Sequence, residues 1–342
     1  MDATPSIISL TGQSLANYVL NGGLLPLNNN EAFIRESTAV TVTLVDENDR
    51  AIACGAIAMY SPKQAYCVLG EIDDEYKNCS IWIEEIPSSR KETRMYRVTK
   101  MIPEILDRTA PTLFETVFAD NDCKPTILHL VDALIDCSVG KANVDLGKNI
   151  TIDLFEGNGG TQQEVISQWR DLSGFVVCDK HRLEEVTVER SYLLGLADET
   201  EAIRTEAIDK NNLLSLLDYD SEMSIYDRTE HVTALINTPE VNGMLAMRSA
   251  QVSGYVLTCK NRILACYAND EEVFRQLISS AVKDMDSDEC KMFVRFGALD
   301  VTQDIIEKAT ERKEVTRLHT RSNINGIKWS AIYCTNVGLH IF

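Results

Sequence analysis

VSGYVLTCKNRILACYANDEEVFRQLISSAVKDM, residues 252–285, is the stretch that decides the fold of the second half of this chain. Two short runs rich in β-branched and aromatic residues, Val252–Thr258 and Arg262–Tyr267, flank a turn-sized gap and predict two paired strands. Apolar residues then recur at positions 273, 274, 277, 278, 281, 282 and 285, which is the spacing of one face of an amphipathic helix over Glu271–Met285. Strands followed by a helix that covers their sheet are typical of mixed α and β domains.

The neighbouring segments extend this pattern in both directions. Gly243–Met247 predicts a strand before the hairpin. After the helix, the pattern predicts in turn a strand, a helix and three closing strands: Lys291–Phe296, Thr302–Glu311, Glu314–Thr320, Ile327–Tyr333 and Gly338–Phe342. This order predicts a mostly antiparallel sheet with one βαβ crossover, an α+β arrangement.

The first half repeats this order with a longer middle. The predicted strands are Val40–Val45, Ala51–Met59, Tyr66–Leu69, Ser80–Ile86, Ile150–Phe155, Phe175–Cys178 and Val186–Leu194. Helical spacing is found in Tyr96–Leu106 and Thr126–Asp136, and a further helix is predicted from Thr161 to Leu172. We therefore expect two consecutive α+β domains, residues 1–196 and 211–342, joined by an acidic linker at 197–210.

The net charge of the chain disfavours some classes of binding partner. The 342 residues carry a formal net charge of −19, from 33 basic and 52 acidic side chains. Such a surface repels phosphate backbones and anionic lipid, so we expect neither nucleic-acid nor membrane-surface binding. No apolar run approaches the length of about 18 residues that a membrane helix needs. The segment Met1–Leu20 has no basic region typical of a secretory signal, so the expected location is cytoplasmic.

Cysteine and histidine spacing predicts no metal site. The ten cysteines include no C-x-x-C pair, and the five histidines are scattered. Most cysteines, for example Cys54, Cys178 and Cys266, lie in apolar strand-like segments. They are expected to be free thiols in a reducing compartment.

Five segments carry a resemblance to a known family. Trp169–Phe175 resembles the L-Y-x-x-x-G-F element near the end of GNAT acetyltransferase domains. Tyr226–Arg228, Val252–Tyr255 and the Tyr267–Ala268 strand end resemble the YitH/HolE-type acetyltransferase C-terminal domain. The segment from Arg317 to Phe342 resembles the tail of a nematode-expanded GNAT-like family of unknown function. The resemblance implies two consecutive GNAT-like domains and an acetyl-CoA-dependent transferase.

The resemblance also implies where the cofactor binds. In this family a glycine-containing loop after the fourth strand holds the pyrophosphate with backbone N–H groups at a helix N-terminus. The corresponding loop here, Pro87–Met95, contains no glycine. Its basic residues either pair with phosphate or form an exposed charged loop; the cofactor contacts implied are Ile83, Ile86, Arg90 and Arg94. In the second half the equivalent segment, Ala268–Glu272, is acidic and is expected to repel phosphate.

Catalytic and substrate residues follow from the same resemblance. Glu84 and Glu85 lie where the family base is expected, and since adjacent strand residues face opposite sides, at most one can point into a cleft. The tyrosine of the L-Y-x-x-x-G-F element is replaced by Arg170, which is a poor general acid. The trio Tyr226, Asp227 and Arg228 either binds substrate or contains an Asp–Arg pair that anchors the domain.

Two other signals have competing interpretations. Gly157–Thr161 is either a phosphate cradle or a flexible turn with a helix cap, and the acidic residues around it favour the turn. Arg317, His319 and Arg321 are spaced by two, so on a strand they share a face. They form either an anion-binding stripe or a set of partners for acidic neighbours.

Three functional hypotheses remain open. The chain is an acyl-CoA-dependent N-acyltransferase with a modified cofactor loop, a GNAT-like module that has lost catalysis and binds or regulates a partner, or a sensor of acyl-CoA or another metabolite. Fold alone does not choose between them. The corresponding ligands are a small amine, an acyl-CoA or a protein, and the sequence does not specify an oligomeric state.

Overall fold

The computed structural model describes residues 39–61, 63–76, 79–88, 93–100, 124–138, 140, 148–155, 167, 169–171, 174–197, 202–237, 240–296 and 299–335. Arg90, the predicted turn Gly157–Thr161 and the predicted strand Gly338–Phe342 lie outside these residues. Sixteen strands form one sheet, most of whose pairings are antiparallel. The predicted α+β class is confirmed, although the two halves share one sheet.

The first half is built on an antiparallel meander followed by a crossover helix. The meander consists of β1 (Ala39–Val45), β2 (Ala51–Ser61) and β3 (Gln64–Ile72). Helix α4 (Thr126–Ser138) then leads to β7 (Asn149–Phe155), which pairs parallel to β3. On the other side of β1 lie, in spatial order, β5 (Thr93–Lys100), β4 (Ser80–Ile86) and β6 (Lys124–Pro125).

The second half repeats the meander, helix and parallel strand. It begins with β10 (Arg204–Ala207) and two helices, α8 (Leu213–Ser221) and α9 (Thr229–Ile236). The meander is β11 (Val241–Arg248), β12 (Gln251–Cys259) and β13 (Arg262–Ala268). Helix α10 (Glu271–Val282) then leads to β14 (Glu289–Arg295), which pairs parallel to β13, and helix α11 (Asp300–Lys308) follows.

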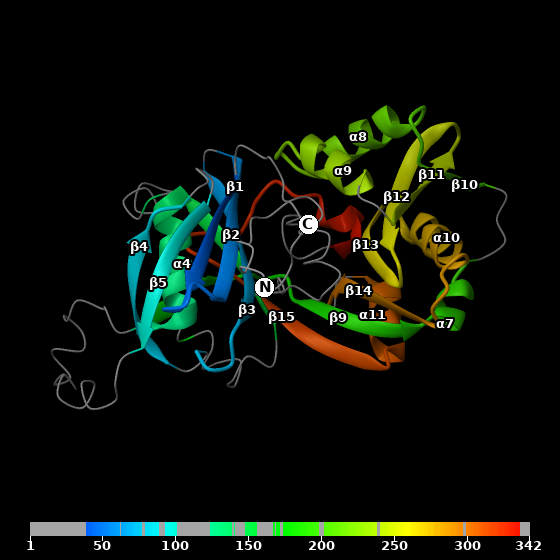
Figure 1. Cartoon of the computed structure of the whole chain (residues 1–342). Helices are drawn as coiled ribbons and strands as arrows, with labels where there is room; N and C mark the ends of the chain where they lie inside the picture. Colours follow the sequence, from blue (N-terminus) through cyan, green and yellow to red (C-terminus); the bar gives the residue numbers. More distant parts are fainter. Residues whose placement is uncertain are drawn as a thin grey trace, which may run out of the picture.

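Two strands cross between the halves. β9 (Leu183–Glu189) comes from the first half and pairs with β14, while β15 (Glu311–His319) comes from the second half and pairs with β7. β9 and β15 also pair with each other, and the short β8 (Val177–Cys178) pairs with β15. Figure 1 shows these long strands running between the meander with α4 on the left and the meander with α10 on the right. The division into domains at residues 197–210 therefore stays a prediction.

Local signals explain the helix that anchors the second half. The Asp270 carboxylate accepts the Val273 backbone N–H at 3.0 Å, which caps the first turn of α10. The apolar face of the helix is buried against the sheet through Val273, Phe274, Leu277, Ile278 and Val282. The predicted helix Glu271–Met285 is confirmed over Glu271–Val282.

Several boundaries differ from the sequence prediction, and four of the differences change the type or extent of an element. Residues Tyr96–Lys100 belong to a strand because their buried side chains, such as Val98, alternate with exposed ones. Arg204–Ala207, expected within the linker, is an edge strand that pairs with β11. The strand expected to run to Leu194 ends at Glu189, where α7 (Arg190–Leu194) begins. Trp329–Ala331 forms a 3-10 turn, so the strand β16 is shorter than predicted, Ile332–Thr335.

The core includes contacts between the two halves. Tyr66, with Cys54 and Ala56 of the first meander, packs in one buried cluster with residues of α8, β12 and β13 of the second half, including Tyr255 and Tyr267. Six of the described cysteines are buried, whereas Cys178 is exposed. Among the described helices, none is long and apolar enough to cross a membrane.

Candidate functional site

The parallel pair β3 and β7 separates toward the carboxyl ends of both strands. Pairing joins Gln64 to Asn149 and continues to Cys67 and Ile152, but β3 runs on to Ile72 and β7 to Phe155. β3 also carries one extra residue opposite β2 between Leu69 and Ile72, a β-bulge. Among the described strands, none pairs with the facing edges of β3 and β7 beyond Cys67 and Ile152. We call this place the first splay, residues 68–72 and 153–155.

The equivalent pair in the second half is filled. β13 and β14 pair only at Arg262 and Lys291 and then diverge. β16 enters between them, pairing Cys334 with both Cys266 and Val294. The side chains Ile332–Thr335 are all buried. Strand β16 therefore satisfies the backbone groups that divergence would otherwise leave unpaired.

The N-terminus of α10 is also occupied by the protein itself. Asp270 caps the helix, and Arg248 forms ion pairs with Asp270 at 2.5 Å and with Glu272 at 2.6 Å. Glu271 and Glu272 lie in the first turn. A helix N-terminus attracts anions, but here carboxylates of the chain already take that position.

Asp153 of the first splay takes part in a buried ion pair that links the halves. The Arg317 guanidinium on β15 donates from Nε to Asp153 Oδ1 and from Nη2 to Asp153 Oδ2, both at 2.7 Å. The Tyr66 hydroxyl donates to Asp153 Oδ2 at 2.5 Å. The Arg317 and Asp153 side chains are 1% and 0% exposed, so the pair is inaccessible to water.

A second buried chain of hydrogen bonds lies beside this pair. His319 contacts Thr151 Oγ1 through Nδ1 at 2.8 Å and Asp179 Oδ2 through Nε2 at 2.9 Å. Gln64 donates to Thr151 Oγ1 at 2.9 Å. Burial alone would raise the pKa of Asp179, but the hydrogen bond with His319 and the charge of Arg317 outweigh it and lower that pKa. Of the two interpretations of the basic stripe, Arg317 and His319 thus pair with acidic neighbours.

The candidate catalytic and cofactor residues lie elsewhere in the sheet. Ile83, Glu84, Glu85 and Ile86 are on β4, which is separated from β3 by β5, β1 and β2. Strand spacing of about 4.8 Å puts β4 roughly 19 Å from β3 along the sheet. The roles assigned to these side chains stay predictions, but the structure does not bring them to the first splay.

Arg94, the described basic residue of the predicted cofactor loop, lies on β5. Its guanidinium pairs with Glu85 at 3.0 Å, and both side chains are about half exposed. Counting hydrophobic runs made Ser80–Ile86 the fourth strand, whereas the strand that pairs parallel to β7 is β3, Gln64–Ile72. Hydrophobic periodicity identifies strands but not their spatial order, which explains the difference.

In the trio Tyr226, Asp227 and Arg228, the side chains of the last two residues form contacts within the protein. Arg228 is buried and forms an ion pair with Asp220 at 2.5 Å, while Asp227 accepts the Thr229 backbone N–H at 3.0 Å. An Asp–Arg pair therefore exists, but its acid stands on α8, eight residues before Arg228.

Two tyrosines complete this cluster. Tyr255 donates to Asp220 Oδ1 at 2.6 Å, and Arg228 Nη1 donates to the Tyr267 hydroxyl oxygen at 3.1 Å. Sequence reasoning missed Asp220 and both tyrosines in this role. No local spacing relates positions on α8, β12 and β13, so the sequence carries no signal for the cluster.

Arg295 is a buried cation of a different kind. Its side chain is 9% exposed, and its guanidinium lies 5.5 Å from the centre of the Trp329 ring. Among the described residues no carboxylate pairs with it, and its Nε is buried without a hydrogen-bond partner. Burial accordingly lowers the pKa of Arg295.

Replacing Arg295 with methionine is expected to raise the free energy of unfolding by roughly 1–2 kcal/mol, because it removes an uncompensated buried charge. Urea denaturation of the purified protein measures the change. Arg262→Met is the matched control: Arg262 is similarly buried, but it pairs with Glu185, so its loss lowers stability. A loss of stability in Arg295→Met would contradict the prediction.

Comparison with known proteins gives one family model, which matches part of the chain. A family model described as a domain of unknown function (DUF7596) matches residues 23–177. No curated protein matches the chain.

Solved structures with a similar fold are distant relatives. A GCN5-related N-acetyltransferase from Sphaerobacter thermophilus has a TM-score of 0.46 and 10% identity, over 90% of this chain and 87% of that one. One from Kribbella flavida has a TM-score of 0.39 and 8% identity, over 57% and 77%. A functionally unknown conserved protein from Staphylococcus epidermidis has a TM-score of 0.41 and 11% identity, over 72% and 96%. At these values nothing about activity is carried over to this chain.

Proposed function

We propose that this chain is an acyl-CoA-dependent N-acyltransferase of the GNAT type, and that acyl-CoA binds at the first splay, between β3 and β7. The observation that carries the proposal is the contrast between the two splayed pairs. In the second half, β16 pairs with both diverging strands. In the first half, the pairing of β3 with β7 stops at Cys67 and Ile152.

β16 indicates what kind of occupant such a splay accepts. It is an extended segment whose backbone amides pair with one strand on each side and whose side chains are buried. The pantetheine arm of acyl-CoA is also extended and carries two amide groups. It can therefore pair with the backbone edges of β3 and β7 in the same manner.

The helix that follows each meander supports the same assignment. Helix α4 has no acidic residue in its first turn, and Lys124 precedes it. Helix α10 has Glu271 and Glu272 in its first turn and a carboxylate cap. Because anions are stabilised at helix N-termini, phosphates are compatible with the start of α4 and not with that of α10. The start of α4 lies beside β4, since Lys124 and Pro125 pair with Ile81 and Ser80, so the cofactor must extend from β3 toward β4 to reach it.

Acyl transfer requires one further group, a base that accepts a proton from the amine. The amine nitrogen attacks the thioester carbonyl, the C–S bond breaks, the thiol leaves and the amine loses a proton to a base. Glu84 or Glu85 as this base, and Tyr226–Arg228 as substrate contacts, stay predictions. For Glu84 or Glu85 to act, the acceptor amine must extend across β1 and β2, since these strands separate β4 and β5 from β3.

Hydrogen–deuterium exchange of the intact protein tests the cofactor site. Acetyl-CoA at about 1 mM, enough to saturate a micromolar site, is expected to slow exchange at residues 68–72 and 153–155 by roughly tenfold or more. The matched internal control is the second half, where exchange at residues 266–268 and 293–295 does not change because β16 already pairs there.

An Arg94→Ala variant separates this site from the predicted loop. Since Arg94 lies three strand spacings from β3, roughly 14 Å, the variant is expected to keep the protection at the first splay. Loss of protection in this variant, or protection confined to residues 80–100, would show that the cofactor binds at the Pro87–Met95 segment instead. No protection anywhere would contradict acyl-CoA binding.

A GNAT-like module without catalysis is the second candidate. This candidate is favoured because Asp153, the ionisable residue of the first splay, already forms hydrogen bonds with Arg317 and Tyr66. Release of free CoA thiol in the presence of a panel of primary amines separates the two candidates. Protection without thiol release would support an acyl-CoA sensor, and thiol release would support the enzyme.

A further inference from the structure

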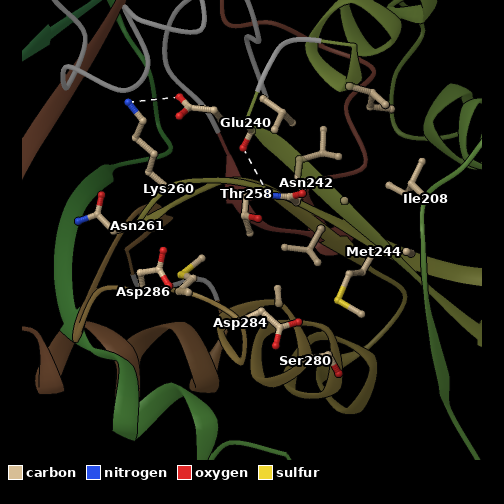
Figure 2. A pocket seen from close by; sticks show the side chains of 18 of the residues that line it. Ile208, Glu240, Asn242, Met244, Thr258, Lys260, Asn261, Ser280, Asp284 and Asp286 are labelled. Atoms are coloured by element: carbon tan, nitrogen blue, oxygen red, sulfur yellow. Dashed lines mark hydrogen bonds and ion pairs between the residues drawn. The ribbon is translucent and has the colours of Figure 1, made fainter.

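A pocket of about 860 Å³ lies in the second half, beside the C-terminal end of α10. Its walls come from the β10–α8 connection, from β11 and β12, and from the chain that follows α10. Figure 2 shows the labelled side chains Thr258, Met244, Asp284 and Asp286 surrounding this space. The pocket is separate from the first splay, since none of its lining residues belongs to β3 or β7.

The polar side of the pocket is acidic. Glu240, Asp284 and Asp286 line it, against the single cation Lys260. Lys260 is already paired with Glu240 at 3.3 Å, and Figure 2 marks this contact. Among the described residues, no ion pair involves Asp284 or Asp286.

The end of α10 adds to this negative potential. The last turn of the helix contains no basic residue, and Ser280 and Ala281 of that turn line the pocket. The carbonyl groups at a helix C-terminus carry a partial negative charge, which favours a cation. Both the carboxylates and the carbonyl groups at the end of α10 therefore make the electrostatic potential in the pocket more negative.

Thr258 is a separate observation that indicates a ligand in this pocket. Its side chain is 7% exposed, and among the described residues its hydroxyl has no hydrogen-bond partner. Figure 2 shows this hydroxyl directed into the pocket, toward the side where Asp284 and Asp286 lie. The hydroxyl oxygen is not among the buried unsatisfied atoms of the described residues, so it faces the open pocket, where a donor or acceptor on a bound molecule can pair with it.

The remaining walls are apolar. Ile208, Met244, Val256 and Met285 also line the pocket. A bare metal ion would gain nothing from these side chains, whereas an alkyl chain would bury its surface against them. The volume lies in the range typical of small-molecule sites.

We propose that this pocket binds an organic cation: a primary ammonium group held by Asp284, Asp286 and the Thr258 hydroxyl, with an alkyl body against Ile208, Met244 and Met285. An ammonium group offers three donors, which matches two carboxylates and one hydroxyl oxygen. The same chemistry occurs in a free alkylamine or diamine and in the lysine side chain of another protein. The proposal does not depend on acyl transfer.

Calorimetric titration of the full chain tests the proposal with three probes. 1,6-Diaminohexane represents a free amine, Nα-acetyl-lysine methylamide represents a protein lysine, and 1,6-hexanediol is the neutral control of the same length. Saturable binding of either amine, weakened by added salt and at least about tenfold tighter than that of the diol, is expected. The amine that binds more tightly identifies the source of the ligand.

Variants locate the binding. Asp284→Asn with Asp286→Asn is expected to weaken amine binding by about tenfold or more, and Thr258→Val by about threefold to tenfold. Asp288→Asn is the matched control, because it removes an exposed carboxylate from the same turn outside the pocket lining. Thermal unfolding of each variant confirms that it is folded.

Three results would overturn the proposal. They are no saturable binding of either amine, equal binding of the diol, and unchanged binding in the Asp284→Asn, Asp286→Asn double variant. A further contradicting result would be an Asp288→Asn variant that loses affinity as much as the double variant does. None of these outcomes bears on acetyl-CoA protection of β3 and β7, so the two proposals fail separately.

Discussion

Replacing Arg317 with methionine is expected to lower the free energy of unfolding by roughly 3–5 kcal/mol, the cost of leaving one charge of a buried pair alone. Asp153 would remain in the sheet with only the Tyr66 hydroxyl as partner. Arg317 stands on β15 and Asp153 on β7, so the pair joins strands from the two halves of the sequence. Urea denaturation followed by tryptophan fluorescence and far-UV circular dichroism measures the loss.

A matched variant separates burial from the simple loss of an arginine. Arg312 lies on the same strand and binds Glu184 through two nitrogens, but its side chain is 46% exposed. Arg312→Met is therefore expected to cost less than about 1 kcal/mol.

Removing both charges of the pair gives a second check. Arg317→Met combined with Asp153→Leu is expected to recover most of the stability, because neither charge of the pair is then left in the core without the other. Equal costs for Arg317→Met and Arg312→Met, or a double variant less stable than Arg317→Met alone, would contradict this account.

Replacing Asp220 with asparagine is expected to have the second largest effect, a loss of roughly 3 kcal/mol. The change keeps the size of the side chain but removes the negative charge of Asp220, which pairs with the Arg228 guanidinium. Both side chains are less than 5% exposed, so water cannot compensate the charge. The asparagine carbonyl can still accept the Tyr255 hydroxyl, so the loss measures the charge and not the hydrogen bond.

Asp218→Asn is the control on the same helix. Asp218 is exposed on α8, and its replacement is expected to change stability by less than about 0.5 kcal/mol. Arg228→Met in the Asp220→Asn background should then restore part of the lost stability, because it removes the unpaired cation. If Asp220→Asn proves as mild as Asp218→Asn, the cluster contributes no such stabilisation.

The two ion pairs also bear on the proposed activity. Asp153 belongs to the first splay, and its pairing with Arg317 holds β7 against β15. Arg317→Met therefore tests whether a correctly held β7 is needed for acyl-CoA binding. If the first splay is the cofactor site, acetyl-CoA protection of residues 153–155 should weaken in this variant under conditions where it remains folded.

Much of the local structure could be predicted because it depends on neighbouring residues. The period of apolar positions after Asp270 and the capping carboxylate itself define α10 without any tertiary contact. Short runs rich in β-branched and aromatic residues identified β12, β13 and β14 from local sequence as well. Where two periods compete over a short run, as in Tyr96–Lys100, the local pattern was ambiguous and the sheet decided in favour of a strand.

The candidate site was less accessible to sequence reasoning. The glycine-free loop and the acidic start of α10 are local features, and both were visible in the sequence. Glu84, Glu85 and Arg94 were placed by counting strands, and that count assumes that strands adjacent in sequence follow one another across the sheet. The parallel partner of β7 is β3, and β4, which carries Glu84 and Glu85, lies four strands away from β3, so the roles of these residues stay predictions.

The sequence by itself determined the element types, the repeated meander, helix and strand of the two halves, and the acidic character of the second-half helix start. Only the tertiary structure decided that β9 and β15 cross between the halves, that β16 fills one splay, and that Arg228 pairs with Asp220 while Arg317 pairs with Asp153. The physical reason is the distance along the sequence between the residues that interact. Helix periods and caps arise from residues a few positions apart, whereas Arg317 and Asp153 are 164 residues apart and meet only when the strands that carry them pair.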